Sequence, residues 1–294
     1  MSAQPLHPQS FLRSTARSTV ALALACLAWL PWQSACDSRG GQQATDAAID
    51  QAKSEALDLG PDLTALPPLL ATFAGCPSTL FADRTAPQDL SSQATFEAAW
   101  RPAWAKPQVK DGALAFGPHP LTADWWENYS PATSLDKPGD VLLCARVRLT
   151  PQENDPVGDN SFELTMRLPE SAMYETSGMV LLVEGNASSV RLRTRTGQDS
   201  WTNYARAPLR LQSGSETTLE LLLYGQGQRF VAEVKNTSTG EIARLRADSS
   251  LPAGGAVTLL GWRSRNGIFV DKLVIGPPST TAAERLMTAL QPPA

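Results

Sequence analysis

The sequence predicts an all-β protein, built as a two-sheet antiparallel β-sandwich of the jelly-roll type. Three observations lead to this prediction: short segments alternate apolar and polar residues, turn-forming residues separate them, and almost no helical periodicity lies between them. Alternation with one polar face is typical of antiparallel sheets. The sequence shows no repeat of fixed period, which argues against a propeller or a solenoid. The chain has nine such segments: 141–149, 161–168, 180–183, 190–196, 219–224, 229–235, 241–246, 257–262 and 268–275.

The clearest segment is 161–168, in which every second side chain from Phe162 to Leu168 is apolar and the residues between them are polar. This period of two predicts a half-buried strand with Ser161, Glu163, Thr165 and Arg167 on the outer face. The segment 141–149 repeats the pattern, with Cys144, Arg146 and Arg148 outward.

Turn chemistry supports the later strands. Gly225 and Gly227 separate 219–224 from 229–235, which predicts a β-hairpin because glycine adopts a positive φ without strain. A short helix over 281–290 is expected to lie outside the sheets, with Thr281 and Glu284 spaced as a capping box.

The N-terminal region has the order of an export signal. Arg13 and Arg17 precede an apolar run over 20–30, and small residues follow up to Cys36. This run is shorter than the roughly 20 residues that cross a bilayer. The order of small residues before Cys36 resembles the lipobox of bacterial lipoproteins, in which that cysteine is lipidated. The alternative is a secreted protein cut near Ala35.

These features divide the chain into four parts. Residues 1–35 form the signal peptide, 36–71 a disordered tether behind the lipid anchor, 72–278 the jelly-roll domain, and 279–294 the short helix and tail. We therefore expect an exported, membrane-anchored lipoprotein that faces the periplasm or the cell surface.

Charge and rare residues exclude several functions. The formal net charge is −4, which provides no electrostatic attraction to nucleic acid. Of the two histidines, only His119 lies beyond the signal, so a multi-histidine metal site is excluded. A catalytic Ser-His-Asp triad would need His119, but its Pro-flanked position predicts a surface turn.

Cys76 and Cys144 form an even pair in an exported chain, which favours a disulfide over two free thiols. Since Cys144 is on the outer face of its predicted strand, the bridge would clamp an N-terminal segment onto that face. The separation of 68 residues gives a stabilisation of about 3–4 kcal/mol in the chain-entropy model.

Three stretches carry a family resemblance. Residues 104–114, W-A-K-P-Q-V-K-D-G-A-L, resemble the W-x-V-x-D-G-x-L opening of concanavalin A-like jelly rolls. Residues 161–168 followed by 175–180 resemble a strand and its S-G-hydrophobic partner in the same superfamily. Residues 261–275 resemble the closing strand of the laminin-G-like and keto-disaccharide-hydrolase-like branches. The resemblance covers about 73–278 and implies a fold, which by itself does not imply a function.

The resemblance also suggests chemistry. Glycosidases of this fold carry several carboxylates on one strand, near E-x-D-x-x-E, whereas Glu163 is alone on its strand here. Laminin-G-like relatives often bind calcium through loop oxygens, and Asp155, Asp159 and Asn160 form an oxygen-rich loop. A solvated turn is the ordinary alternative to such a calcium site, and we expect no other cofactor.

The aromatic residues are the candidates for carbohydrate binding, because sugar C–H groups stack on exposed ring faces. Trp125 and Trp126 are adjacent, so an extended chain would turn one of them outward; Trp201 and Tyr204 lie in a polar stretch. Core or rim packing is the alternative for each ring.

A row of arginines, Arg191, Arg193 and Arg195, shares one predicted strand face. The row could bind an acidic glycan or a lipid head group. The acidity of the chain instead favours pairing with Glu and Asp on neighbouring strands.

Three functions are compatible with these features. The leading hypothesis is a lipid-tethered jelly roll that binds a glycan or a cell-envelope partner without catalysis. The alternatives are a carbohydrate-active hydrolase that resembles keto-disaccharide hydrolases, and a structural envelope lipoprotein. An aromatic-lined groove would favour the first two, and two carboxylates meeting in it would favour the hydrolase.

Overall fold

The structure is a computed structural model, which describes residues 76, 78–82, 88–136, 138, 140–152, 159–169, 178–197 and 200–290. The chain divides into two compact units, 1–58 and 59–294, and every described residue belongs to the second. The predicted signal peptide, the tether and Cys36 lie outside the described residues. None of the described helices is long and apolar enough to cross a membrane.

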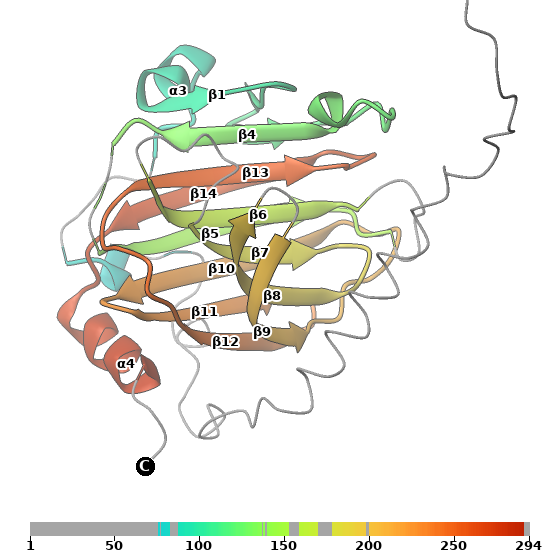
Figure 1. The fold of residues 1–294 in the computed structure, drawn as a ribbon. Coiled ribbons are helices and arrows are strands. Elements are labelled where there is room, and N and C mark those ends of the chain that lie inside the picture. The colour runs from blue at the N-terminus through green and yellow to red at the C-terminus, as the bar shows by residue number, and fades with distance from the viewer. Residues whose placement is uncertain are drawn as a thin grey trace, which may run out of the picture. The chain divides into compact units, whose positions relative to one another are not determined.

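Two seven-stranded antiparallel sheets form the molecule, which confirms the predicted β-sandwich (Figure 1). The β6 sheet has the order β1-β4-β13-β6-β7-β8-β9, and the β5 sheet has the order β12-β11-β10-β5-β14-β3-β2. The strands of the β6 sheet are β1 (Trp100–Pro102), β4 (Tyr129–Ser134), β13 (Ala256–Trp262), β6 (Ser161–Leu168), β7 (Met179–Glu184), β8 (Ser189–Gly197) and β9 (Ser200–Pro208). Those of the β5 sheet are β12 (Ile242–Asp248), β11 (Arg229–Asn236), β10 (Thr217–Gln226), β5 (Leu142–Leu149), β14 (Ile268–Gly276), β3 (Ala113–Phe116) and β2 (Gln108–Lys110).

All nine predicted segments are strands, and five further strands went unpredicted. Strands β1, β2 and β3 are only three or four residues long, too short for a period to show. Strand β4 contains Pro131, and β9 is half-exposed along most of its length, so neither has an apolar stripe. The helix α3 (Gln93–Ala99) was also missed; the Ser92 side chain caps it and it buries only Phe96.

The main core lies between the sheets, where the inward residues predicted for β5 and β6 are buried. Phe116 from the β5 sheet packs edge-on against Phe162 from the β6 sheet, with 5.9 Å between ring centroids. Gly261 leaves the room for this contact, since a Cβ there would lie 2.3 Å from the Cβ of Phe116.

The outer face of the β5 sheet carries a second, smaller core. Cys76 and Cys144 form the predicted disulfide, with 5.6 Å between their Cα atoms. Beside it, Ala282 and Leu286 of helix α4 (Thr280–Leu290) are buried against this face. The prediction that the bridge clamps an N-terminal segment onto the outer face is therefore confirmed, as is the position of the helix outside the sheets.

Two local predictions are wrong. The C-terminal helix starts one residue early, and the side chain of Ser279 accepts the hydrogen bond from the Ala282 amide, so Thr281 and Glu284 form no capping box at its start. Strand β6 is not half-buried, because all eight of its residues are buried. The reason is the β8–β9 hairpin, part of which turns across the outer face of β6 and β7 (Figure 1) and brings Arg193 to Glu163.

Candidate functional site

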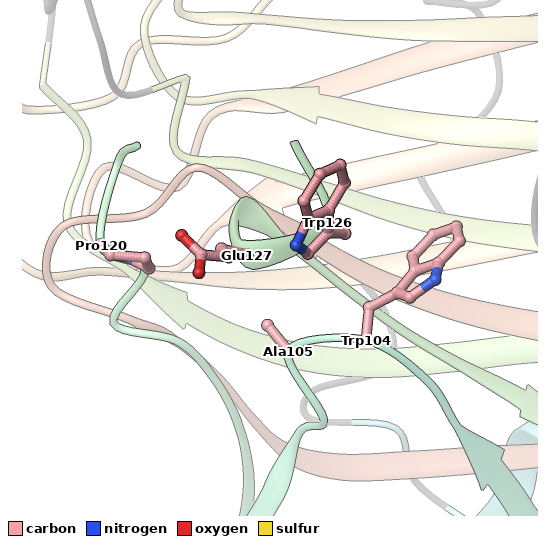
Figure 2. Close-up of a pocket in the computed structure, with 5 residues that line it drawn as sticks. All are labelled: Trp104, Ala105, Pro120, Trp126 and Glu127. Atoms are coloured by element: carbon pink, nitrogen blue, oxygen red, sulfur yellow. The ribbon is translucent and has the colours of Figure 1, made fainter. Parts of the chain in front are cut away.

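An open pocket of about 330 Å³ lies beside the start of β4, where it is lined by Trp104, Ala105, Pro120, Trp126 and Glu127 (Figure 2). Trp126 is 48% exposed, and Leu135 at 46% is the only other large apolar side chain of the described residues that is comparably exposed. The Glu127 carboxylate lies between Pro120 and Trp126 in Figure 2. The pocket therefore combines two tryptophans with one carboxylate.

Hydrogen bonds fix the short 3₁₀ helix η3 (Trp125–Asn128), which carries Trp126 and Glu127. The Asn128 side-chain amide donates to the carbonyl oxygens of Thr122 (2.7 Å) and Asp124 (3.0 Å). The Thr122 hydroxyl donates to Glu127 Oε2 at 2.6 Å. The carboxylate is therefore oriented before any ligand arrives, which lowers the entropic cost of binding.

Three of the eight non-glycine residues with a positive φ in the described part of the chain lie at or next to the pocket. Trp104 and Leu121 have φ values of 53° and 56°, and Arg263, whose amide donates to the Asn128 carbonyl oxygen, has 48°. Non-glycine residues seldom occupy this left-handed region, and each costs about 1–2 kcal/mol.

An aromatic row continues from the pocket along the sheet. The ring of Tyr129 lies 5.3 Å from that of Trp104 and 5.7 Å from that of Trp262, the latter edge-on. The Tyr129 ring packs against Trp104 and is itself packed against Trp262, so the orientation of Trp104 does not depend on a ligand.

The Pro-flanked position of His119 predicted a surface turn, and this prediction is wrong. His119 is buried next to the pocket. Its Nδ1 accepts a hydrogen bond from the Ser264 amide at 3.0 Å, so the ring proton of the neutral form sits on Nε2. Nε2 then donates to Ser130 Oγ at 2.7 Å, and the Ser130 hydroxyl donates to the carbonyl oxygen of Ala105. The Gly117–Pro118 turn that was expected to expose His119 instead folds it inward.

This network is not a nucleophilic dyad. A catalytic serine gives its proton to the histidine, whereas here the histidine donates to a serine that is fully buried. Burial lowers the pKa of His119 to about 4, so it is neutral at pH 7. The network thus holds Ala105 and the Pro120 segment in place.

The arginine row has the paired arrangement that the acidity of the chain favoured. Arg193 forms an ion pair with Glu163 at 2.6 Å, and Arg191 forms one with Glu184 at 2.8 Å. The Trp201 ring lies against this row, with the Arg193 guanidinium 3.7 Å and the Arg195 guanidinium 5.7 Å from its centroid. An intramolecular cation therefore already occupies one face of Trp201.

Tyr204 serves the interior rather than a binding surface. It is half-buried against the main core, and its hydroxyl donates to Ser249 Oγ at 3.1 Å and lies 3.3 Å from Thr194 Oγ1. Trp125 lies in η3, but its side chain is outside the described residues.

The predicted calcium loop is only partly described, because Asp155 lies outside the described residues. Asp159 Oδ1 accepts a hydrogen bond from the Asn186 side chain at 3.3 Å, and Asn160 is fully buried. The described residues contain no group of three or more His, Cys, Asp or Glu that could hold a metal ion.

Sequence reasoning identified Trp126 but missed Trp104 and Glu127. Trp104 stands in the W-x-V-x-D-G-x-L stretch, which indicates the fold and not a site. Glu127 directly follows the Trp pair, and this adjacency of an acid to two aromatics was the available signal. Trp104 lies in one pocket with Trp126 and Glu127 because the chain between residues 104 and 126 reverses direction.

Comparisons with known proteins give matches to solved structures alone, since no protein-family model and no curated protein matches the chain. The carbohydrate-binding module CBM66 from Bacillus subtilis is 14% identical, with a TM-score of 0.41 over 62% of this chain and 94% of that one. A β-1,3-1,4-glucanase (lichenase) from a mouse hindgut metagenome is 15% identical, with a TM-score of 0.45 over 65% of this chain and 98% of that one.

Winged bean acidic lectin, complexed with methyl-α-D-galactose, is 9% identical, with a TM-score of 0.49 over 64% of this chain and 94% of the lectin. The assignment of the fold itself rests on the strand order and antiparallel pairing described above.

Proposed function

We propose that this protein binds carbohydrate, and that the pocket of Trp104, Trp126 and Glu127 is the binding site. The observation that carries the proposal is the exposed Trp126 ring beside a second tryptophan and an oriented carboxylate. The ring faces accept the C–H groups of a pyranose, and the carboxylate accepts hydrogen bonds from its hydroxyls. A few placed polar groups on an aromatic wall are typical of small-ligand sites.

The proposed binding is not coupled to hydrolysis. A glycosidase needs two carboxylates across the scissile bond, about 5–5.5 Å apart in retaining enzymes. The pocket lining contains one, Glu127. The carboxylates of Glu163 and Glu184 on the outer face of the β6 sheet are each committed to an arginine.

We further propose that the chain is exported and held at a membrane by a lipid on Cys36, facing the periplasm or the cell surface. The support comes from the order of residues over 13–36 and from the Cys76–Cys144 disulfide, a bond that persists in oxidising compartments. Metabolic labelling with a radioactive fatty acid should mark the chain, and Cys36→Ala should abolish both the label and the membrane association. Release of an unlabelled protein cut near Ala35 would contradict the anchor.

A glycan array followed by isothermal titration calorimetry tests the binding site. Trp126→Ala should lower the affinity at least about tenfold, equivalent to about 1.4 kcal/mol. Leu135→Ala is the matched control, because Leu135 is equally exposed at the far end of β4. Release of reducing sugar from a bound glycan would support the hydrolase instead. Binding to no glycan would favour a structural role.

A further inference from the structure

We propose that the pocket selects a saccharide that carries a protonated amine, such as a polymer of 2-amino-2-deoxyhexose. This inference rests on the proposed function and names the chemical class of its ligand. The reasons are the charge of the pocket, its aromatic walls, and an arrangement elsewhere in the same molecule that shows how these groups hold a cation.

The charge in the pocket lining is entirely negative. Glu127 is the one ionisable residue among the five that line it. Its Oε2 atom accepts from the neutral Thr122 hydroxyl, and no lysine or arginine of the described residues lies within ion-pairing distance of it. By contrast, Glu163, Glu184 and Asp271 each pair with an arginine.

The walls of the pocket also favour a cation. The face of an indole ring carries negative electrostatic potential and attracts an ammonium group within about 6 Å. Trp126 and Trp104 both line the pocket, and the Glu127 carboxylate lies on the Pro120 side of Trp126 (Figure 2). An amine bound there would meet a carboxylate and an aromatic face together.

The β8–β9 hairpin shows the completed arrangement. The Arg193 guanidinium donates to Glu163 Oε1 at 2.6 Å and lies 3.7 Å from the Trp201 centroid. Carboxylate, cation and tryptophan are all supplied by the protein there. The pocket lining contains a carboxylate and two tryptophans but no cationic side chain among its five residues, so a ligand bound there would supply the cation.

Three tetrasaccharides with the same β-1,4 backbone test the inference, since they differ only at C2: glucosamine, N-acetylglucosamine and glucose tetramers. We expect the glucosamine tetramer to bind the full chain at least about tenfold more tightly than the other two at mildly acidic pH. Raising the pH until the amine is neutral should remove this preference in the unmodified protein.

Glu127→Gln should abolish the preference and also lower the affinity for the neutral tetramers, because the amide keeps the size of the carboxylate but loses its charge and one hydrogen-bond acceptor. Glu284→Gln removes the same charge from an exposed residue of α4, which packs on the β5 sheet, and should change neither. A thermal melt checks that each variant is folded.

The possible outcomes separate the two proposals. Equal affinity for all three tetramers, or a preference that survives in Glu127→Gln or at alkaline pH, overturns the amine selectivity and leaves carbohydrate binding intact. Failure of all three tetramers and of the glycan array to bind overturns both. Loss of the preference on amine neutralisation supports the inference even if the Glu127 variant does not fold.

Discussion

The pocket and the β8–β9 hairpin contain the same kinds of residue in opposite conditions. At the hairpin, Arg193 of β8 lies between Trp201 of β9 and Glu163 of β6, and the outer face of β6 is buried. In the pocket, Trp126 is exposed and the Glu127 carboxylate is paired with a neutral hydroxyl. The difference is that the hairpin supplies an arginine beside its tryptophan, whereas none of the five residues that line the pocket is cationic, and this contrast supports the proposed site.

The largest expected effect is a loss of stability when the ion pair of the β8–β9 hairpin is broken, which would show that this hairpin has a structural role. Arg193→Met should lower the free energy of unfolding by about 3–5 kcal/mol, because it leaves Glu163 buried and uncompensated. The two side chains are 12% and 6% exposed in the folded protein. Urea denaturation measures the loss.

The double variant Arg193→Met/Glu163→Leu should recover most of that loss, since apolar residues can replace a buried ion pair. Arg206→Gln is the mild control, because Arg206 lies 3.9 Å from Glu184 and its side chain is half-exposed. Equal destabilisation of the single and double variants would show that the ion pair is not the cause.

The next effect concerns the network behind the pocket. His119 binds a proton only below its folded pKa of about 4, whereas the unfolded chain binds one near 6.5. The unfolded state therefore holds more protons between these values, and stability falls as the pH falls. The loss from this group should approach about 3 kcal/mol between pH ~7 and pH ~4.

Urea denaturation across this pH range measures the contribution. His119→Asn has no titrating ring, so its stability should be lower at neutral pH but should lack this part of the pH dependence. A parallel pH profile in the variant would assign the acid sensitivity to other groups.

A smaller effect is expected at the pocket surface. Trp126→Ala should change the free energy of unfolding by less than about 0.5 kcal/mol, because an exposed side chain contributes little to stability. Trp126→Ala should instead lower the affinity for the glycan, as described under the proposed function. A large loss of stability would mean that Trp126 packs as structure, as Trp201 does.

A stability effect between those of His119 and Trp126 is expected at Tyr204, the aromatic residue of the same polar stretch as Trp201. Tyr204→Phe should cost about 0.5–1.5 kcal/mol, the net value of the hydroxyl's hydrogen bonds to Ser249 and Thr194. Glycan affinity should be unchanged. Weaker binding in this variant would move the site from the pocket to the hairpin.

Much of the architecture could be predicted from the order of residues. The period of two in 141–149 and 161–168 predicted both strands and their inward faces, because a strand turns alternate side chains to one side. The Cys76–Cys144 bridge followed from an even pair of cysteines in a chain that the sequence predicts to be exported. The lipid anchor at Cys36 remains a prediction from the sequence.

The remainder depended on contacts between distant segments. Whether Glu163 faces water or Arg193 depends on a hairpin that begins 26 residues later, and whether His119 is exposed depends on Ser264. The alternation of apolar and polar residues predicts a strand and its two faces, but it does not predict which segment covers the outer face. The sequence by itself determined the strands, their inward faces and the disulfide pair, since these follow from periodicity and composition. Only the tertiary structure decided that Trp104, Trp126 and Glu127 line one pocket while Glu163 pairs with Arg193, because these neighbours come from segments that are distant in the sequence.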